Sequence, residues 1–380
     1  MRIGFDAKRA FHNRTGLGNY SRWVLEGLSG RFPEAELLGF NPKAGAAWSQ
    51  PPVAVRECRP KGVCTLWPGL WRRGGVVRDL KRENVSLYHG LSNELPAGLP
   101  AHIGSVVSIH DLIFERFPQW YKPIDRHTYR LKFRSAARGA HRVLALSEQT
   151  RRDLIEFYGI APERIELHYQ SCHRDFQVEP ERLDKASTTA AAHCREWGYP
   201  ADFVLYVGTV EPRKNLLTLL KALGPLDLPL VVVGAGGAYR KECQAWAEQA
   251  GMASRVQWYD RLPQGHLPEL YRAAMMLVYP SYFEGFGIPI LEALFSGCPV
   301  VTSAGGVFPE TGGPGSVYVD PGSVEGVRAA VIDVAEDAAR RAQMRSLGHR
   351  YAWEHFEPNT LIDKLYQTYH TVVDEVKTLR

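Results

Sequence analysis

Short apolar runs alternate with amphipathic helical patterns along most of this 380-residue chain. Apolar runs between turn residues are typical of buried strands, and the patterns between them recur at helical spacing. Strands that alternate with helices favour parallel sheets with helices on both faces. The pattern therefore predicts an α/β protein.

The alternation occurs in two series, and a chain of this length suits about two domains. The first series of expected strands is Ile3–Asp6, Leu37–Phe40, Val53–Arg56, Val85–His89, Gly104–His110, Val143–Leu146 and Ile165–His168. The second series is Phe203–Val207, Leu230–Val233, Val256–Tyr259, Met276–Tyr279, Val300–Thr302 and Val317–Val319. We interpret the alanine-rich segment 177–200 as the linker region. The predicted domains are 1–195 and 196–358, and an amphipathic helix is expected within 359–380.

Composition sets limits on the class of protein. Hydrophobic residues make up 45% of the chain and charged residues 23%, as in ordinary globular proteins. No stretch reaches about 18 apolar residues, so no membrane-spanning helix is expected. The six cysteines form no C-x-x-C pair, which argues against a zinc site and a disulfide framework and fits a reducing cytoplasm.

Positive charge is concentrated in the first half. Residues 1–200 hold 30 Lys and Arg against 21 Asp and Glu, whereas the remainder holds 16 against 20. A basic half suits nucleic acid, anionic lipid or phosphorylated substrates, but no nucleic-acid-binding signature is present. The aromatic and basic segment 67–82 predicts peripheral contact with an anionic membrane. The alternative is a solvated helix over a partly buried tryptophan.

Two carboxylates flank a glycine-containing loop in the second half. Glu284 follows the expected strand Met276–Tyr279, and Glu292 lies about one turn into a helix that begins near Pro289. Ligands of open α/β sheets bind at the carboxyl ends of strands, where carboxylates meet ligand hydroxyls. The alternative is a helix that carries two surface acids, and the pair alone does not decide between them.

Further polar groups follow expected strands. His110 ends an apolar strand, where it offers a donor or base near neutral pH; the alternative is a satisfied core histidine. Arg213 and Lys214 follow the first strand of the second half after Gly208, and both suit a diphosphate. Gly16 and Gly18 precede a helix expected from Asn19, and they form either a phosphate-binding loop or a plain turn.

Together these motifs resemble the retaining nucleotide-sugar glycosyltransferases of family 4, which have the GT-B fold of two Rossmann-like domains facing across a cleft. The resemblance spans nearly the whole chain. Its most specific parts are the E-x7-E pair Glu284 and Glu292 and the block 208–215. The form of that block is most similar to mannosyltransferases of bacterial surface-polysaccharide assembly.

The resemblance implies a role for each matching residue. Arg213 and Lys214 neutralise the donor diphosphate, Glu292 binds the ribose, Glu284 faces the donor sugar, and His110 contacts the sugar near the reacting carbon. The implied catalytic residues are His110, Glu284, Arg213 and Lys214. The implied donor-binding residues are Gly16, Gly18, Gly208, Leu262, Gly285, Phe286, Gly287, Ile288 and Glu292. One departure is the sequence 259–262, which replaces the family's usual glycine near the base.

The resemblance further implies a hexosyltransferase that keeps the anomeric configuration and needs neither a metal nor a cofactor. The N-terminal domain binds a saccharide or polyprenyl-linked acceptor, and the C-terminal domain binds the nucleotide sugar, with GDP-mannose as first guess and a UDP-sugar as the alternative. We expect a cytoplasmic enzyme, peripheral on the inner face of the membrane. Two other hypotheses are a nucleotide-sugar epimerase on the same fold and a non-catalytic saccharide-binding protein.

Overall fold

The computed structural model describes residues 1–45, 48 and 50–378. The chain divides into two compact units, which we describe separately: Met1–Ser171 with Phe356–Arg380, and Cys172–His355. No helix within the described ranges is long and apolar enough to cross a bilayer.

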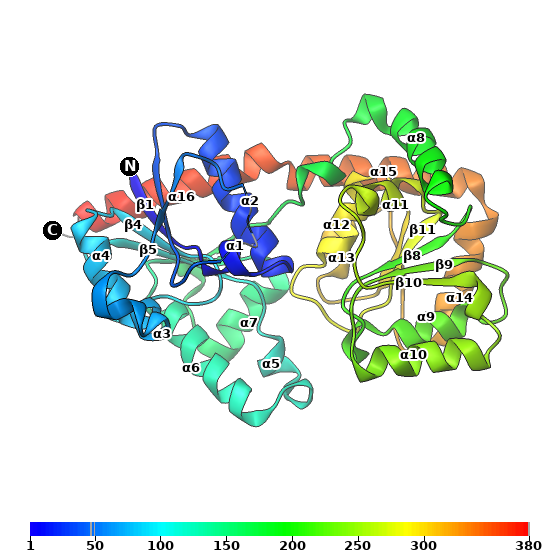
Figure 1. The fold of residues 1–380 in the computed structure, drawn as a ribbon, viewed down its shortest axis with the longest axis horizontal. Helices are drawn as coiled ribbons and strands as arrows, with labels where there is room; N and C mark the ends of the chain where they lie inside the picture. The colour runs from blue at the N-terminus through cyan, green and yellow to red at the C-terminus, as the bar shows by residue number, and fades with distance from the viewer. Residues whose placement is uncertain (46–47, 49, 379–380) are drawn as a thin grey trace. The chain divides into compact units, whose positions relative to one another are not determined.

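The first unit contains a seven-stranded parallel sheet in the order β3-β2-β1-β4-β5-β6-β7 (Figure 1). Its strands are β1 (Arg2–Asp6), β2 (Glu36–Phe40), β3 (Val55–Cys58), β4 (Leu87–Gly90), β5 (Gly104–Ile109), β6 (Arg142–Ala145) and β7 (Ile165–Leu167). All seven predicted strands are present, although β3 and β4 each begin two residues later than expected. The chain passes repeatedly through helices because neighbouring strands run parallel.

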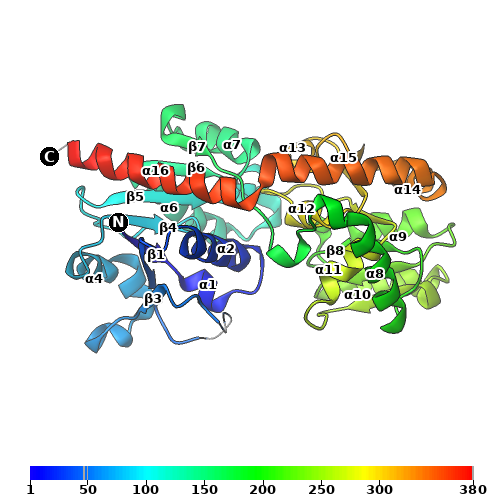
Figure 2. The ribbon, with the colours of Figure 1, turned by 90° about the horizontal axis from the view of Figure 1, so that it is seen from above.

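The first sheet is covered on both faces. Its helices are α1 (Lys8–His12), α2 (Gly16–Arg31), η1 (Gly62–Thr65), α3 (Pro68–Leu70), η2 (Trp71–Gly75), α4 (Val76–Arg82), α5 (Ile113–Arg116), η3 (Pro118–Trp120), α6 (Pro123–Gly139), α7 (Glu148–Tyr158), η4 (Pro162–Arg164) and α16 (Pro358–Thr378). Side chains of α2 and α16 share one apolar cluster with Leu37 and Leu87, and Figure 2 shows these two helices side by side. The other face packs against η2, α4, α6 and α7.

The second unit contains a six-stranded parallel sheet in the order β10-β9-β8-β11-β12-β13. Its strands are β8 (Val204–Val207), β9 (Leu230–Val233), β10 (Val256–Tyr259), β11 (Met276–Tyr279), β12 (Val300–Ser303) and β13 (Val317–Val319). Its helices are η5 (Arg174–Phe176), η6 (Pro180–Arg182), α8 (Leu183–Glu196), η7 (Pro212–Lys214), α9 (Leu216–Leu223), α10 (Ala238–Gln249), η8 (Ala253–Arg255), α11 (His266–Ala273), α12 (Ile288–Phe295), α13 (Phe308–Gly312), α14 (Val324–Glu336) and α15 (Ala338–Phe356). All six strands lie where the apolar runs predicted them.

Two predicted features differ from the structure. The segment 177–200 is not a simple linker, because α8 forms within it and packs extensively against α11. The chain consequently passes from the first unit to the second between Ser171 and Cys172, earlier than the predicted boundary after residue 195. The expected terminal helix is α16, which packs on α2 and β5 of the first unit.

Candidate active site

The candidate site of the second unit lies at the carboxyl ends of two neighbouring strands. β8 and β11 pair in parallel, so the segments that follow them meet at one edge of the sheet. After β8 the chain passes through Gly208 to η7, which carries Arg213 and Lys214. After β11 it forms the loop that contains Glu284 and then enters α12. Residues 70 positions apart in sequence are thereby brought into contact.

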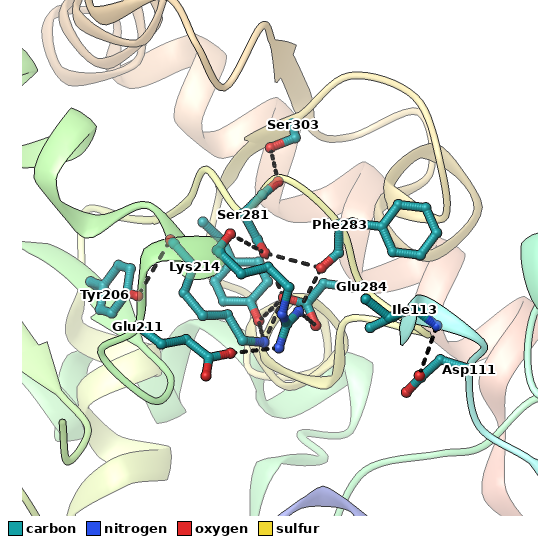
Figure 3. Close-up of polar contacts among 11 residues, drawn as sticks. Asp111, Ile113, Tyr206, Glu211, Lys214, Ser281, Phe283, Glu284 and Ser303 are labelled. Carbon is teal, nitrogen blue, oxygen red and sulfur yellow. Dashed lines mark hydrogen bonds and ion pairs between the residues drawn. The ribbon is translucent and has the colours of Figure 1, made fainter. Parts of the chain in front are cut away.

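Lys214 and Glu284 form the centre of the site (Figure 3). The ammonium Nζ of Lys214 lies 2.5 Å from Glu284 Oε1, and it donates to the Tyr279 hydroxyl at 2.6 Å. The same carboxylate oxygen accepts from the hydroxyls of Tyr279 and Ser281, at 2.9 and 2.6 Å. Glu284 is only 7% exposed, so these contacts satisfy a charge that has left water.

Arg213 binds the second oxygen of the same carboxylate. Its Nη1 lies 3.1 Å from Glu284 Oε2 and donates to the Phe283 carbonyl at 2.6 Å, while Nη2 lies 2.7 Å from Glu211 Oε1. Two cations thus face two carboxylates, and the cluster is balanced in charge. These contacts do not use every N–H group of Arg213 and Lys214. The remaining N–H groups can bind a further anion.

Electrostatics fix the charge states of this cluster. Burial raises the pKa of the Glu284 carboxyl, but Lys214 and Arg213 outweigh burial and lower that pKa to about 2. Burial alone would lower the pKa of Arg213, yet Glu284 and Glu211 raise it. Burial lowers the pKa of Lys214 although Glu284 opposes that shift. Glu284 is therefore ionised at neutral pH, and it acts as the counterion of both cations.

Asn215 connects the segments that follow β8 and β11 through hydrogen bonds. It adopts a left-handed backbone conformation with φ of 59°, which asparagine tolerates better than most residues. Its side-chain amide donates to the carbonyls of Pro280 and Pro321, at 3.0 and 2.7 Å. Ser303 adds a donor to the Ser281 carbonyl at 2.6 Å. These contacts connect the segments that carry Arg213, Lys214 and Glu284 at the edge of the sheet.

Glu292 lies in a different environment from Glu284. It belongs to α12, is 8% exposed, and accepts a hydrogen bond from the Tyr271 hydroxyl of α11 at 3.0 Å. Burial raises the pKa of Glu292 to about 7, because the tyrosine opposes that effect only in part. The structure thus separates the two members of the acid pair: Glu284 is ion-paired, whereas Glu292 is held by one neutral donor.

The loop between Glu284 and Glu292 has a backbone conformation that suits the close approach of a ligand. Gly287 has a φ of 94° and is the N-cap of α12, with Pro289 in the first helical turn as predicted. The Phe286 carbonyl accepts from the Thr311 hydroxyl at 2.5 Å, while Gly285 lies between Glu284 and this anchored residue. Ile288 opens the helix. The predicted donor-binding residues 285–288 therefore lie beside the Glu284 cluster.

Two further predicted donor-binding residues follow strands on the β8 side of the second sheet. Gly208 directly follows β8 with a φ of 148°, and its carbonyl oxygen would lie 1.9 Å from a Cβ at Gly234. Leu262 follows β10, the outer strand beyond β9, and is partly exposed. No contact ties Leu262 to the Glu284 cluster among the described residues, and its role remains a prediction.

His110 follows β5 in the first unit and is almost fully buried. Its Nε2 lies 2.9 Å from the Leu91 carbonyl oxygen, which only accepts, so Nε2 carries the hydrogen. Asn93 accepts from the His110 backbone N–H at 2.8 Å, and the Tyr20 ring packs edge-on at 4.8 Å. Burial lowers the pKa of His110 to about 4. The ring is consequently neutral near pH 7, with Nδ1 as an acceptor.

The two glycines of the first unit lie inside a helix. We predicted a helix from Asn19, but α2 already begins at Gly16. A Cβ at Gly18 would lie 2.0 Å from the Asn13 carbonyl oxygen, so packing explains this glycine. A Cβ at Gly16 would meet nothing within 4 Å, so packing does not explain that one.

The structure places part of the segment 67–82 in the interior of the first unit. Arg72 is not available to a membrane, because its guanidinium binds both Asp6 and, at 2.7 Å, Glu94. Trp71 is buried and donates to Asp79 at 2.6 Å. Sequence reasoning missed this cluster, although the position of Asp6 at the end of the first strand was a signal for it.

Sequence reasoning also gave no role to Tyr279, Ser281 and Tyr271, the hydroxyl donors to the two acids. Tyr279 ends β11 and Ser281 follows two residues later, so the position of both was a usable signal. Tyr271 comes from α11 and had none. Among the described residues no group of three or more histidine, cysteine, aspartate or glutamate side chains could hold a metal ion.

Comparison with known proteins identifies two family models. Residues 199–350 match the model "Glycosyl transferases group 1", and residues 25–170 match "Glycosyltransferase Family 4". O-antigen chain mannosyltransferase B of Escherichia coli is 30% identical over 301 residues, which cover 76% of each chain.

Solved structures share the fold. Sucrose-phosphate synthase from Thermosynechococcus elongatus superposes with a TM-score of 0.78 and 19% identity, covering 99% of this chain and 100% of that one. Anabaena HepE in complex with UDP and glucose gives a TM-score of 0.75 and 19% identity, covering 98% and 100%.

Proposed function

Because the chain belongs to the family 4 glycosyltransferases and has the GT-B fold, we propose that it transfers a hexose from a nucleoside-diphosphate sugar with retention of the anomeric configuration. The observation that carries this proposal is the buried Lys214–Glu284–Arg213 cluster at the carboxyl ends of β8 and β11. The donor diphosphate binds the remaining hydrogens of the two cations, and Glu292 accepts from the ribose hydroxyls.

The chemistry follows from charge that develops during the reaction. When the bond between the sugar and the diphosphate breaks, negative charge grows on the leaving phosphate oxygen. Arg213 and Lys214 stabilise that charge without moving, because Glu284, Tyr279 and Phe283 already hold them. The leaving phosphate then helps to take the acceptor proton on the same face of the sugar, which preserves the configuration.

Glu284 consequently has a positioning role in this proposal. Its Oε1 accepts from three groups and its Oε2 faces Arg213, which leaves little capacity for a sugar hydroxyl. A direct contact between Glu284 and the donor sugar is a secondary proposal. His110 is proposed to accept a hydrogen bond from a sugar hydroxyl through Nδ1, since Nε2 is bound to Leu91.

The donor and acceptor follow from the relatives. The similarity to an O-antigen mannosyltransferase supports GDP-mannose as donor and a saccharide or polyprenyl-linked saccharide as acceptor. A UDP-sugar is the alternative, since HepE is solved with UDP and glucose. We propose that the reaction needs no metal or organic cofactor and takes place in the cytoplasm, with the enzyme peripheral on the inner face of the membrane.

Two measurements test the proposal. Thermal-shift assays with GDP, UDP and ADP should show stabilisation by one nucleotide, because a ligand that binds only the folded state raises apparent stability by mass action. Radiolabelled sugar should then move from the matching donor to a saccharide acceptor, and NMR should report a retained anomeric configuration. Turnover of donor alone to an epimer would support an epimerase, and no response to any nucleotide would contradict the donor site.

A further inference from the structure

A large cavity of the second unit lies at the end of the sheet opposite the candidate active site. It has a volume of about 960 Å³, within the range of about 300–1,000 Å³ that small-molecule sites occupy. Met275 and Pro299, which directly precede β11 and β12, line this cavity, whereas the Glu284 cluster follows the carboxyl ends of β8 and β11. The cavity is therefore separate from the site proposed for the sugar donor.

Three helices supply most of the residues around this cavity. α8 contributes Leu183, Asp184 and Ser187, and the end of α11 contributes Arg272 and Ala273. Residues of α15 line the cavity at intervals of three and four, which places them on one side of that helix. Figure 1 shows α8 and α15 on one side of the second sheet, with α9 and α10 on the other. One side of α15 therefore faces an open cavity.

Arginine side chains give the cavity its positive charge. The charged residues that line it are Asp184, Arg272, Arg341, Arg345, Arg350 and Glu354. Arg272 is paired at 2.6 Å with Glu269, which is not part of the lining. Arg341 and Arg350 have no carboxylate within ion-pair distance among the described residues, and both acids of the lining are exposed. The lining therefore carries more positive charge than its own acids neutralise.

Arg345 is a largely buried cation without a buried counterion. Its side chain is 22% exposed, and its Nη2 lies 3.5 Å from Oδ1 of Asp184, whose own side chain is fully exposed. The same nitrogen donates to the Leu183 carbonyl at 2.5 Å, while Nε is buried without an acceptor among the described residues. Burial lowers the pKa of Arg345, because Asp184 opposes that shift only in part. A cation removed from water without a matched carboxylate indicates a position that an external anion can occupy.

The cavity also has room and apolar surface for more than an inorganic ion. Gly297 has a φ of 71°, and a Cβ at this position would lie 2.5 Å from Leu183 and 3.2 Å from Arg345 Nε. The glycine therefore keeps space beside the guanidinium. Trp353 is partly exposed in the lining, and its indole N–H donates to the Val178 carbonyl at 3.1 Å, which orients the ring. An oriented aromatic ring beside cations suits a ligand that has both an organic part and a charged part.

We propose that this cavity binds a small phosphorylated organic molecule, with its phosphate on Arg341, Arg345 and Arg350 and its organic part against Trp353. A phosphate group presents three strong acceptor oxygens to the three guanidinium groups, whereas a carboxylate presents two. The contacts of Arg341 and Arg345 to backbone carbonyls use Nη1 and Nη2 respectively, so N–H groups of both remain for a ligand. The inference goes beyond the proposed sugar transfer, in which this cavity takes no part.

Calorimetric titration of the full chain with defined probes tests the class of ligand. Glucose 6-phosphate and phenyl phosphate should bind more tightly than inorganic phosphate, because only the first two have an organic part. Citrate should bind more weakly than either organic phosphate, and glucose should not bind. Equal affinity for inorganic and organic phosphates, tighter binding of citrate, or no binding of any phosphate would overturn the inference.

Substitutions on α15 locate the site. Ala342 is exposed and lines the cavity, so Ala342→Glu places a carboxylate beside the phosphate position. Ala342→Glu and Arg350→Gln should each weaken binding of glucose 6-phosphate by at least about tenfold, through repulsion or loss of a charge-assisted contact.

Two matched controls lie on the same helix outside the lining. Ala339→Glu adds the same charge at another exposed alanine, and Arg340→Gln removes an arginine that pairs with Asp333 at 2.5 Å. Both should bind glucose 6-phosphate as the wild type does. Equal losses in the cavity variants and the controls, or loss in Lys214→Ala but not in Ala342→Glu, would overturn the location.

The outcome is separable from that of the proposed function. The thermal response of Ala342→Glu to GDP, UDP and ADP reports on the candidate active site. A retained nucleotide response with weakened binding of glucose 6-phosphate would support the cavity, whereas retention of both would overturn it. If Ala342→Glu does not fold, Arg350→Gln decides in its place, because that side chain is exposed. A wild-type chain that binds glucose 6-phosphate but no nucleotide would contradict the proposed function alone.

Discussion

The two units follow the same architectural plan, but they treat positive charge in opposite ways. In the second unit Arg213 and Lys214 have side chains only 18% and 13% exposed, and both contact Glu284. In the first unit, by contrast, Arg73, Lys122 and Arg134 are exposed. A buried cation needs a counterion, whereas a surface cation is solvated. Charge along the chain therefore says less about role than burial and partner do.

Arg72 shows that the contrast does not simply follow the unit boundary. It belongs to the basic first half, yet it is 14% exposed and bound by Asp6 and Glu94. Its neighbour Arg73 is exposed. Two adjacent arginines of one short helix therefore differ in the same way, one buried and ion-paired and the other exposed. The contrast is between buried and exposed cations rather than between the two units.

The largest expected effect is loss of the shared counterion. Glu284→Ala leaves Arg213 and Lys214 buried with Glu211 as their remaining carboxylate, which should lower the free energy of unfolding by about 3–5 kcal/mol. Glu211→Ala is the control, since that side chain is 40% exposed and its pair should contribute less than about 1 kcal/mol. Urea unfolding followed by tryptophan fluorescence measures both. Equal losses would remove the distinction between buried and exposed pairs.

Removal of one buried cation should act mainly on the reaction. Arg213→Ala or Lys214→Ala deletes a charge-assisted contact to the diphosphate, at a cost of about 1.5–3 kcal/mol or roughly ten- to hundredfold in kcat/KM. Lys221→Ala, which removes an exposed cation from α9, should leave kcat/KM unchanged. Unaltered kinetics in both site variants would refute the diphosphate assignment.

Acid should weaken the first unit through His110. Burial lowers the folded-state pKa of His110 to about 4, below its ordinary 6.5, so between these values the unfolded chain binds more protons. Stability from this group is present above about pH 6.5 and is lost as pH falls towards 4. Between pH 7 and pH 5 this group should lower the free energy of unfolding by about 2 kcal/mol.

The variant His110→Gln isolates that contribution, because its amide still donates to Leu91 but does not titrate. Urea unfolding at pH 7 and pH 5 measures the free energy of unfolding of both proteins. Its decrease between these pH values should be about 2 kcal/mol smaller in the variant than in the wild type. The same pH dependence in both proteins would mean that His110 is protonated as easily in the folded state as in the unfolded chain.

The smallest effect concerns Glu292. Burial raises the pKa of Glu292 to about 7, and the ionised carboxylate is the form that accepts from ribose hydroxyls. Nucleotide affinity should therefore fall by up to about tenfold between pH 8 and 6. Glu292→Gln should bind more weakly at pH 8 and lack this step. Calorimetric titration of both proteins at each pH removes the contribution of the nucleotide's own phosphate, since that contribution is common to both.

The fold was largely predictable from local pattern. The apolar runs that became β9, β10, β11 and β13 were predicted at their exact bounds, because buried parallel strands need continuous apolar side chains. The helix α7 likewise has local signals at both ends, since Ser147 caps its first turn and Gly159 follows its last turn in the left-handed conformation. Short-range rules suffice where the determining contacts lie within a few residues.

The partners of each charge were decided only by the tertiary structure. Glu284, Glu292, Arg213 and Lys214 follow strands whose carboxyl ends are ligand sites, and the family resemblance predicted them as one set. The sequence could not show that Glu284 is an ionised counterion while Glu292 titrates near pH 7, since Lys214 and Tyr271 reach them only through the order of the strands. For the same reason the segment 67–82 did not show which of its arginines is buried: Asp6 and Glu94 meet Arg72 only when the first sheet has formed.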